Sequence, residues 1–245
     1  SEKLKSGLSN RTVKFMHSIL HKSLEQAARW GMVIRKVSGL VDPPSVSHKA
    51  PVTLTAEQVA TFLNQTKSSR FYPMYCLAMI GLREGEILGL HIEDFDRESR
   101  TIHIKHAVQY LVGKGLVITE PKTEKARRSL KIPDFVYEAL IGHLDLRNRN
   151  QGLMFVTANG TPYSPRNFVR DFKDQLNAAG LPEIRFHDLR HTTATLLLSQ
   201  NVHPKVVQEI LGHSQISLTM DVYSHVIPSV MDDALKLLDN TVAIK

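Results

Sequence analysis

The sequence RFHDLRHTTATLLL, residues 185–198, places two arginines, two histidines and an aspartate in its first seven positions and continues as an apolar run. This arrangement predicts a helix over residues 187–200. His187 and Arg190 are three residues apart and therefore share one face of that helix. Taken alone, the pair fits simple helix capping as well as a functional cluster.

Further helices are predicted on either side of this stretch, with a group of strands between them. Thr55 and Gln58 form a capping box at the start of one helix. Prolines, periodicity and stop signals predict other helices at residues 72–80, after 133–134, from 164–165 to Gly180, at 204–211 and at 217–224. Apolar and polar residues alternate over 101–109, and a glycine turn then leads into residues 116–119, which together predict a hairpin. Residues 129–132 are predicted to form a third strand. The expected fold is mainly α with a small antiparallel β-sheet, an α+β architecture.

The composition is that of an ordinary soluble protein. Of the 245 residues, 42% are hydrophobic and 22% are charged, which is enough apolar material for a packed core. The longest charge-free apolar stretch, residues 71–82, falls short of the roughly 18 residues that span a bilayer. The single cysteine, Cys76, allows no internal disulfide and favours a reducing compartment. We therefore expect a cytoplasmic protein without a membrane partner.

Positive charge is concentrated at the N-terminal end. The net charge is +7, and residues 1–50 contribute +6 of it, from nine Lys or Arg against three acids. This distribution favours a polyanionic partner that binds to one end of the chain. Residues 10–34 predict one helix, capped by Ser9 or Asn10. Four basic residues lie near one another on one face of this helix and are candidates for DNA binding, although an ordinary solvent-exposed helix face would explain them equally well. They are Arg11, Lys14, Lys22 and Arg29.

The domain organisation follows from a change in composition. Residues 37–53 lose helical periodicity and gather prolines and serines, as a linker does. One long helix cannot bury its own apolar stripe, so residues 1–36 are expected to be part of a larger helical domain. A second domain is expected over residues 54–245, with a tail helix from about residue 229.

Six residues from four clusters of unusual composition form one pattern. They are Arg83, Lys122, His187, Arg190, His213 and Tyr223, with His-x-x-Arg followed by 22 residues, His, nine residues and Tyr. In this order the set resembles the catalytic residues of the tyrosine recombinase (phage integrase) family, and the resemblance covers residues 50 to 230. The helix of residues 10–34 looks like the last helix of that family's core-binding domain, so the resemblance implies that residues 1–36 are the C-terminal part of a helical DNA-binding domain. The resemblance implies the tyrosine recombinase catalytic fold for residues 54–245.

The resemblance also implies the reaction. It predicts a site-specific DNA recombinase, an integrase of a phage or mobile element, that cuts and rejoins double-stranded DNA without a metal or other cofactor. Tyr223 would be the nucleophile that forms a 3′-phosphotyrosyl intermediate. His187 would be its general base, and Lys122 the acid that protonates the departing 5′ oxygen.

The remaining site residues are expected to stabilise the charge of the phosphate or to orient the side chains that do so. Arg83, Arg190 and His213 can donate to the phosphate oxygens, whose negative charge grows in the transition state. Glu86 and His191 are expected to orient these groups, although packing explains both equally well.

Three other functions compete with this interpretation. His187 and His191 lie four residues apart on a helix, loosely like a zinc protease, but Arg190 would bring a cation to the ligand face. A non-enzymatic DNA-binding regulator would use the basic helix but leaves the six-residue pattern unexplained. Within the family, a chromosome-dimer resolvase or an invertase would share the same site.

The C-terminal tail predicts how subunits associate. Residues 229–240 carry an apolar stripe that needs a partner, either its own domain or a neighbouring subunit. With docking on a neighbour, we expect a free monomer that assembles as a homotetramer on two synapsed DNA sites.

Overall fold

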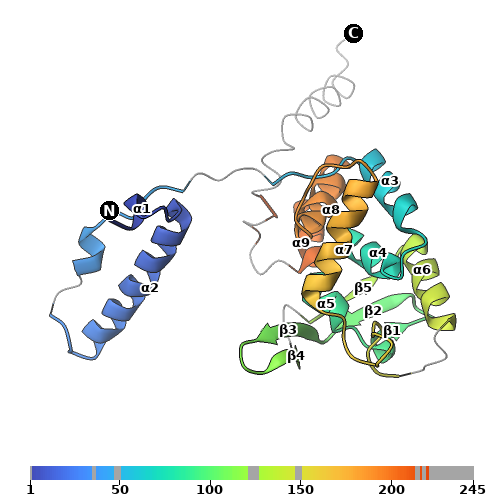
Figure 1. Ribbon diagram of the computed structural model, residues 1–245, viewed down its shortest axis with the longest axis horizontal. Helices are drawn as coiled ribbons and strands as arrows, with labels where there is room; N and C mark the ends of the chain where they lie inside the picture. Colours follow the sequence, from blue (N-terminus) through green and yellow to red (C-terminus); the bar gives the residue numbers. More distant parts are fainter. Residues whose placement is uncertain are drawn as a thin grey trace, which may run out of the picture. The chain divides into compact units, whose positions relative to one another are not determined.

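The computed structural model of the chain describes residues 2–34, 37–46, 51–120, 127–146, 151–212, 216 and 219–220. The chain divides into two compact units, Ser1–Ala50 and Pro51–Lys245, each of which is described by itself (Figure 1). Within the described ranges, no helix is both long and apolar enough to cross a membrane.

The first unit is built on one long helix. Its elements are α1 (Glu2–Lys5), α2 (Asn10–Arg29) and the 3-10 helix η1 (Val37–Leu40). Ser9 caps α2 as predicted, because its side chain accepts a hydrogen bond from the Thr12 amide. The predicted end at residue 34 is wrong: α2 ends at Arg29, and Gly31 follows with a left-handed φ of 73°. Such a conformation cannot continue a helix and favours glycine.

Two histidines tie η1 to α2. His17 contacts the Ser38 carbonyl oxygen through Nε2 at 3.1 Å, and His21 contacts the Ser38 hydroxyl through Nδ1 at 3.0 Å. Part of the segment for which a linker was expected therefore packs on the helix. The four basic residues of α2 named from the sequence are all exposed: Arg11, Lys14, Lys22 and Arg29.

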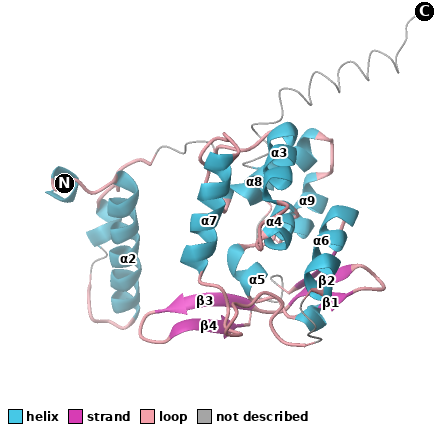
Figure 2. Ribbon diagram, turned by 45° about the vertical axis from the view of Figure 1, so that its right-hand side comes forward, coloured by secondary structure: helices cyan, strands magenta, loops and turns pink. Residues whose placement is uncertain are grey.

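The second unit is mainly helical, as predicted, with its strands gathered at one end (Figure 2). Its helices are α3 (Ala56–Thr66), α4 (Tyr72–Met79), α5 (Glu84–Leu88), η2 (Ile92–Asp94), α6 (Asp134–Asp145), α7 (Pro165–Ala178), α8 (Asp188–Ser199) and α9 (Pro204–Leu211). Its strands are β1 (Phe95–Asp96), β2 (Thr101–Ile104), β3 (Ala107–Leu111), β4 (Gly115–Thr119) and β5 (Arg128–Lys131).

The described strands form two small antiparallel sheets instead of the single sheet that the sequence predicted. One has the order β1-β2-β5, and the other is the hairpin of β3 and β4. The segment 101–109, predicted as one strand, is interrupted at Lys105 and His106. The reason lies in Asp94, which is buried and draws the Lys105 ammonium to 3.0 Å of its Oδ1. The chain turns there and passes from one sheet to the other.

The core is centred on α4, whose residues from Pro73 to Met79 are all buried. Tyr75 packs against the rings of Phe62, Phe168 and Phe172, which come from α3 and α7. Its hydroxyl donates to Asp171 Oδ2 at 2.5 Å, which satisfies the one polar atom in this cluster. The core thus holds α4, and the turn that follows it, in a fixed place.

The predicted capping box at the start of α3 is confirmed in both of its hydrogen bonds.

The C-terminal half of α8 packs on α9 through a smaller apolar cluster of Ala194, Leu198, Val207 and Leu211. Thr193 of α8 donates to the Met79 carbonyl at 2.9 Å. This bond holds the middle of α8 against the end of α4.

Candidate active site

The N-terminal end of α8 meets the turn between α4 and α5. Arg190 has only 3% of its surface exposed, and its Nη1 donates to the Gly81 carbonyl at 2.6 Å. Gly81 has a φ of 88°, a conformation that glycine adopts without strain and that turns the chain toward Arg83. Two arginines 107 positions apart in the sequence are thereby brought to one site.

Arg83 is held by a carboxylate at the start of α5. Its Nη1 donates to Glu86 Oε1 at 2.6 Å and its amide to Glu86 Oε2 at 2.9 Å. Its Nη2 donates to the Gly212 carbonyl at 3.1 Å, just after α9. The side chain of Arg83 is still 39% exposed, so part of its guanidinium faces solvent.

A second arginine shares Glu86, and no motif in the sequence pointed to it. Arg128, at the start of β5, donates from Nη1 to Oε1 and from Nη2 to Oε2, each at 3.0 Å. Its Nε donates to the Ile210 carbonyl at 3.1 Å. Burial alone would raise the pKa of Glu86, but Arg128 and Arg83 outweigh it and lower this pKa. Glu86 therefore keeps its negative charge between two guanidiniums.

The buried arginine remains charged as well. Burial, together with the positive charges of Arg83 and Arg128, lowers the pKa of Arg190 to about 9. At neutral pH this leaves a guanidinium with its full charge. The site is thus strongly positive, with Glu86 as its nearby counter-ion, and suits an anionic ligand.

His187 and His191 lie at the same end of α8. Their rings are 5.2 Å apart and nearly perpendicular. Desolvation, followed by the charges of His191, Arg190 and Arg83, lowers the pKa of His187. Desolvation also lowers the pKa of His191. Both imidazoles are neutral at pH 7 and able to accept a proton.

Asp188 completes this end of the helix. It accepts two hydrogen bonds from the Arg185 guanidinium, at 3.0 and 2.7 Å, and one from the Arg185 amide at 2.9 Å. The carboxylate is thus engaged by Arg185. It orients the first turn of α8, from which His187 and Arg190 project.

The structure brings together four of the eight candidate site residues, with His191 beside them: Arg83, Glu86, His187 and Arg190. The other three candidates, Lys122, His213 and Tyr223, lie outside the described residues. The chain positions around them are defined: β4 and β5 flank the segment of Lys122, and His213 follows Gly212 directly. The predicted helix at 217–224 and the tail helix also lie outside the described residues.

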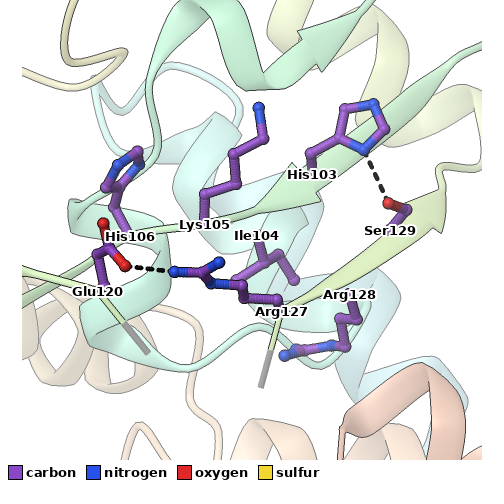
Figure 3. A pocket seen from close by; sticks show the side chains of 8 residues that line it. All are labelled: His103, Ile104, Lys105, His106, Glu120, Arg127, Arg128 and Ser129. Atoms are coloured by element: carbon purple, nitrogen blue, oxygen red, sulfur yellow. Dashed lines mark hydrogen bonds and ion pairs between the residues drawn. The ribbon is translucent and has the colours of Figure 1, made fainter. Parts of the chain in front are cut away.

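A pocket opens beside this site, between β2 and the facing ends of β4 and β5 (Figure 3). Arg127 pairs with Glu120 there, while its neighbour Arg128 extends away toward Glu86. His103 contacts the Ser129 hydroxyl at 2.7 Å. Lys105 and His106 complete its polar lining.

One group among the described residues could hold a metal ion: His91, Asp94 and His106, with donor atoms within 4.8 Å of one another. Asp94 already pairs with Lys105 through Oδ1 at 3.0 Å. His91 Nδ1 is 3.1 Å from the Gly89 carbonyl, a contact that requires a proton on that nitrogen. The carboxylate already has a cationic partner and this nitrogen of His91 is a donor, so we assign the group to the structure of the turn.

Comparison with known proteins identifies the family. The model of the phage integrase family matches residues 53–229. A tyrosine recombinase XerC-like protein of Caldanaerobacter subterraneus is 29% identical over 96% of this chain and 67% of its own length. The ICEBs1 integrase of Bacillus subtilis is 27% identical over 97% of this chain and 67% of its own length. The chain thus spans about two thirds of the length of these relatives.

Solved structures share the fold. The Tn1549 transposon integrase in complex with circular intermediate DNA is 26% identical, with a TM-score of 0.75 over 96% of this chain and 83% of that one. A lambda integrase dimer bound to a COC′ core site is 18% identical, with a TM-score of 0.67 over 91% of this chain and 76% of that one. The mainly helical architecture with small antiparallel sheets is therefore confirmed as that of tyrosine recombinases.

Proposed function

The chain belongs to the phage integrase family and is a site-specific recombinase, and from this premise we propose how its residues cut and rejoin DNA. Tyr223 attacks a phosphorus of double-stranded DNA, the bond to the 5′ oxygen breaks, and the protein is joined to the DNA as a 3′-phosphotyrosine. Attack by a 5′ hydroxyl of the partner strand then releases Tyr223. The phosphodiester bond is conserved, so the exchange needs no external energy source.

The observation that carries this proposal is the convergence of Arg83, His187 and Arg190. The charges of both arginines act on the His187 imidazole, so the three groups lie within electrostatic reach of one another. Two planar guanidiniums match the non-bridging oxygens of a phosphodiester, whose negative charge grows in the five-coordinate transition state. The neutral imidazole beside them is suited to accept the proton of an attacking phenol.

The remaining roles rest on the resemblance. A phenolate leaves more readily than a sugar alkoxide, because phenols are far more acidic than sugar hydroxyls, and this suits Tyr223 to the rejoining step. Lys122 gives a proton to the departing 5′ oxygen, and His213 donates to a phosphate oxygen. Glu86 and His191 orient the charged groups around the phosphate. The proposal needs no metal ion or other cofactor for the chemistry.

The test uses the full chain and a nicked suicide substrate that carries the site found by footprinting on the DNA beside its gene. The wild type is expected to form a covalent protein–DNA adduct, also in EDTA, with a free 5′ hydroxyl. Tyr223→Phe should bind this DNA and form no adduct. Tyr110→Phe is the matched control, because Tyr110 lies on the β3–β4 hairpin with 69% of its surface exposed, and its adduct yield should be unchanged.

The same experiment separates the alternatives. An adduct of undiminished yield in Tyr223→Phe would remove Tyr223 from the mechanism. A non-enzymatic DNA-binding regulator would bind the site and form no adduct with either tyrosine variant or the wild type. Cleavage that stops in EDTA would point to a metal-dependent hydrolase.

We further propose that the recombinase serves a mobile element or phage and acts in the cytoplasm. The ICEBs1 integrase and the transposase from transposon Tn916 of Enterococcus faecalis, 28% identical over 70% of this chain, support this role by their names. The exposed basic residues of α2 would grip the DNA backbone beside the cleaved site: Arg11, Lys14, Lys22 and Arg29. Integration assays against excision, inversion and dimer-resolution substrates distinguish these roles.

The assembly state is expected to change when the protein binds DNA. The protein is a monomer when free and a homotetramer on two synapsed sites, with residues 229–240 docked on a neighbouring subunit. Light scattering with and without site DNA tests the two states. Truncation after Val226 should leave the cleavage rate unchanged and should impair recombination between two sites. Full recombination without the tail would show that the tail covers its own domain.

A further inference from the structure

We propose that Arg128 is a positioning residue that keeps Arg83 available to the phosphate by sharing Glu86 with it. The inference deepens the proposed function and rests on it, because the phosphate is the ligand that Arg83 is assigned. It concerns a residue that stands in a run of basic side chains, KARRSLK at 125–131, and that carried no role in the sequence pattern.

The Glu86 carboxylate is divided between two guanidiniums. Oε1 of Glu86 accepts from Arg83 Nη1 and Arg128 Nη1, and Oε2 accepts from the Arg83 amide and Arg128 Nη2. Arg128 forms the bidentate pair, whereas the Arg83 guanidinium forms a single bond. The geometry thus gives Arg128 the larger share of the carboxylate.

The two cations differ in exposure. The Arg128 side chain is 8% exposed and the Glu86 side chain 7%, whereas Arg83 is 39% exposed. A buried pair with two parallel hydrogen bonds is fixed in orientation. Arg128 is therefore the permanent partner of Glu86, and Arg83 is the cation of this group that can turn part of its fork to a ligand.

The same contact extends to α9. Nε of Arg128 donates to the Ile210 carbonyl and Nη2 of Arg83 to the Gly212 carbonyl, both at 3.1 Å. A Cβ on Gly212 would lie 2.9 Å from Arg128 Nη1, so the chain passes directly over this guanidinium. Arg128 thereby links β5, α5 and the end of α9, immediately before the position of His213.

The consequence is a specific prediction for the loss of Arg128. Without it, Glu86 keeps its charge in a buried place and has Arg83 as its remaining cation among these contacts. Arg83 should then close fully onto the carboxylate and leave the phosphate. Lysine at this position restores the charge but forms a single bond in place of the fork, so it should recover part of the function.

The experiment compares adduct formation in single turnover, with every DNA molecule bound, for the full chain. Arg128→Met should slow the adduct about 10- to 100-fold, as loss of a supporting contact typically does, while DNA affinity changes less than threefold. Arg128→Lys should lie between. Arg127→Met is the matched control, since it removes the same charge one residue earlier from a surface pair with Glu120, and its single-turnover rate should equal that of the wild type.

Two double variants separate positioning from a merely structural role. In an Arg83→Lys background, Arg128→Met should add less than a threefold loss, because the residue acts through Arg83. Glu86→Gln in the Arg128→Met background removes the stranded charge and should recover at least a threefold rate. A full additional loss in the first case, or a further loss in the second, would overturn the inference, as would a wild-type rate for Arg128→Met.

Failure of the proposed function has a different signature, since the wild type would then form no adduct. Urea unfolding of the same variants tests the sharing of Glu86 without any activity. The shifts in midpoint caused by Arg83→Lys and Arg128→Met should be non-additive. Strict additivity would show that the two arginines do not share Glu86, and would refute the inference independently of DNA.

Discussion

Arg190 donates a 2.6 Å hydrogen bond to the carbonyl of Gly81, a residue 109 positions earlier in the chain. This bond joins α8 to the turn that leads into Arg83, and both partners are buried. A guanidinium with one nitrogen hydrogen-bonded to the protein backbone is fixed in orientation before any substrate binds. Preorganised donors of this kind stabilise developing charge without a cost of reorganisation in the transition state.

Arg190→Lys is therefore expected to lower the cleavage rate about 100- to 1000-fold, the range typical for loss of one preorganised donor. Lysine keeps the positive charge but can supply neither the fixed fork nor the Gly81 bond together with a phosphate contact. The measurement is adduct formation at saturating protein, with DNA affinity followed separately. A rate within tenfold of the wild type would show that charge alone suffices at this position.

The pH dependence of cleavage should report His187. Desolvation and the neighbouring cations lower the pKa of this imidazole below its usual 6.5. Because a general base acts in its neutral form, the rate should be constant through neutral pH and fall on the acidic side as His187 is protonated, with an apparent pKa below 6.5. His187→Gln should remove this acidic limb and leave a slow residual rate. An acidic limb that persists in the variant would belong to another group.

The sequence was sufficient for the parts of this protein that depend on local pattern. The caps of α2 and α3 were readable, because Ser9 and Thr55 satisfy backbone amides a few residues away. Arg83, His187 and Arg190 could be nominated together because their order matches the pattern of a known family. Neither composition nor periodicity would have placed Arg83 beside α8.

What could not be predicted depends on contacts between distant segments. Arg128 stands among other basic residues, and its pairing with Glu86, 42 positions earlier, becomes visible in the fold. The break between β2 and β3 follows from the attraction of Lys105 to the buried Asp94, while residues 101–109 continue to alternate as in one strand. In both cases a buried carboxylate selects its partner through tertiary structure, which a local pattern does not encode.

Binding to DNA should depend on salt through the basic face of α2. Arg11 and Lys22 are exposed and eleven residues apart, about three turns of helix. Replacing both by Gln should reduce the slope of log affinity against log salt by about 2, since each phosphate contact contributes about 0.9. Lys67→Gln with Arg97→Gln, exposed residues of the second unit, is the control with the same change in net charge. Equal slopes for the two double variants would assign the effect to net charge instead of to α2.

The stability of the site should depend on a close approach between α5 and the β3–β4 hairpin. A Cβ on Gly89, just after α5, would lie 2.8 Å from Ala107 Cα, a backbone atom that cannot move aside. Gly89→Ala is therefore expected to destabilise the protein by about 1–3 kcal/mol, the usual cost of overpacking. It should also slow adduct formation, because α5 carries Glu86 and the displaced hairpin leads into the segment of Lys122.

Gly142→Ala is the matched control for this last prediction. Gly142 lies inside α6 with open space around the position of a Cβ, so alanine meets no obstacle there. The same change should raise stability by about 1 kcal/mol, the difference in helix propensity between the two residues, and leave the adduct rate unchanged. Urea unfolding of both variants gives the comparison. If Gly89→Ala were as stable as the wild type, the strand would have room to move away from α5, and the contact would not fix the place of Glu86.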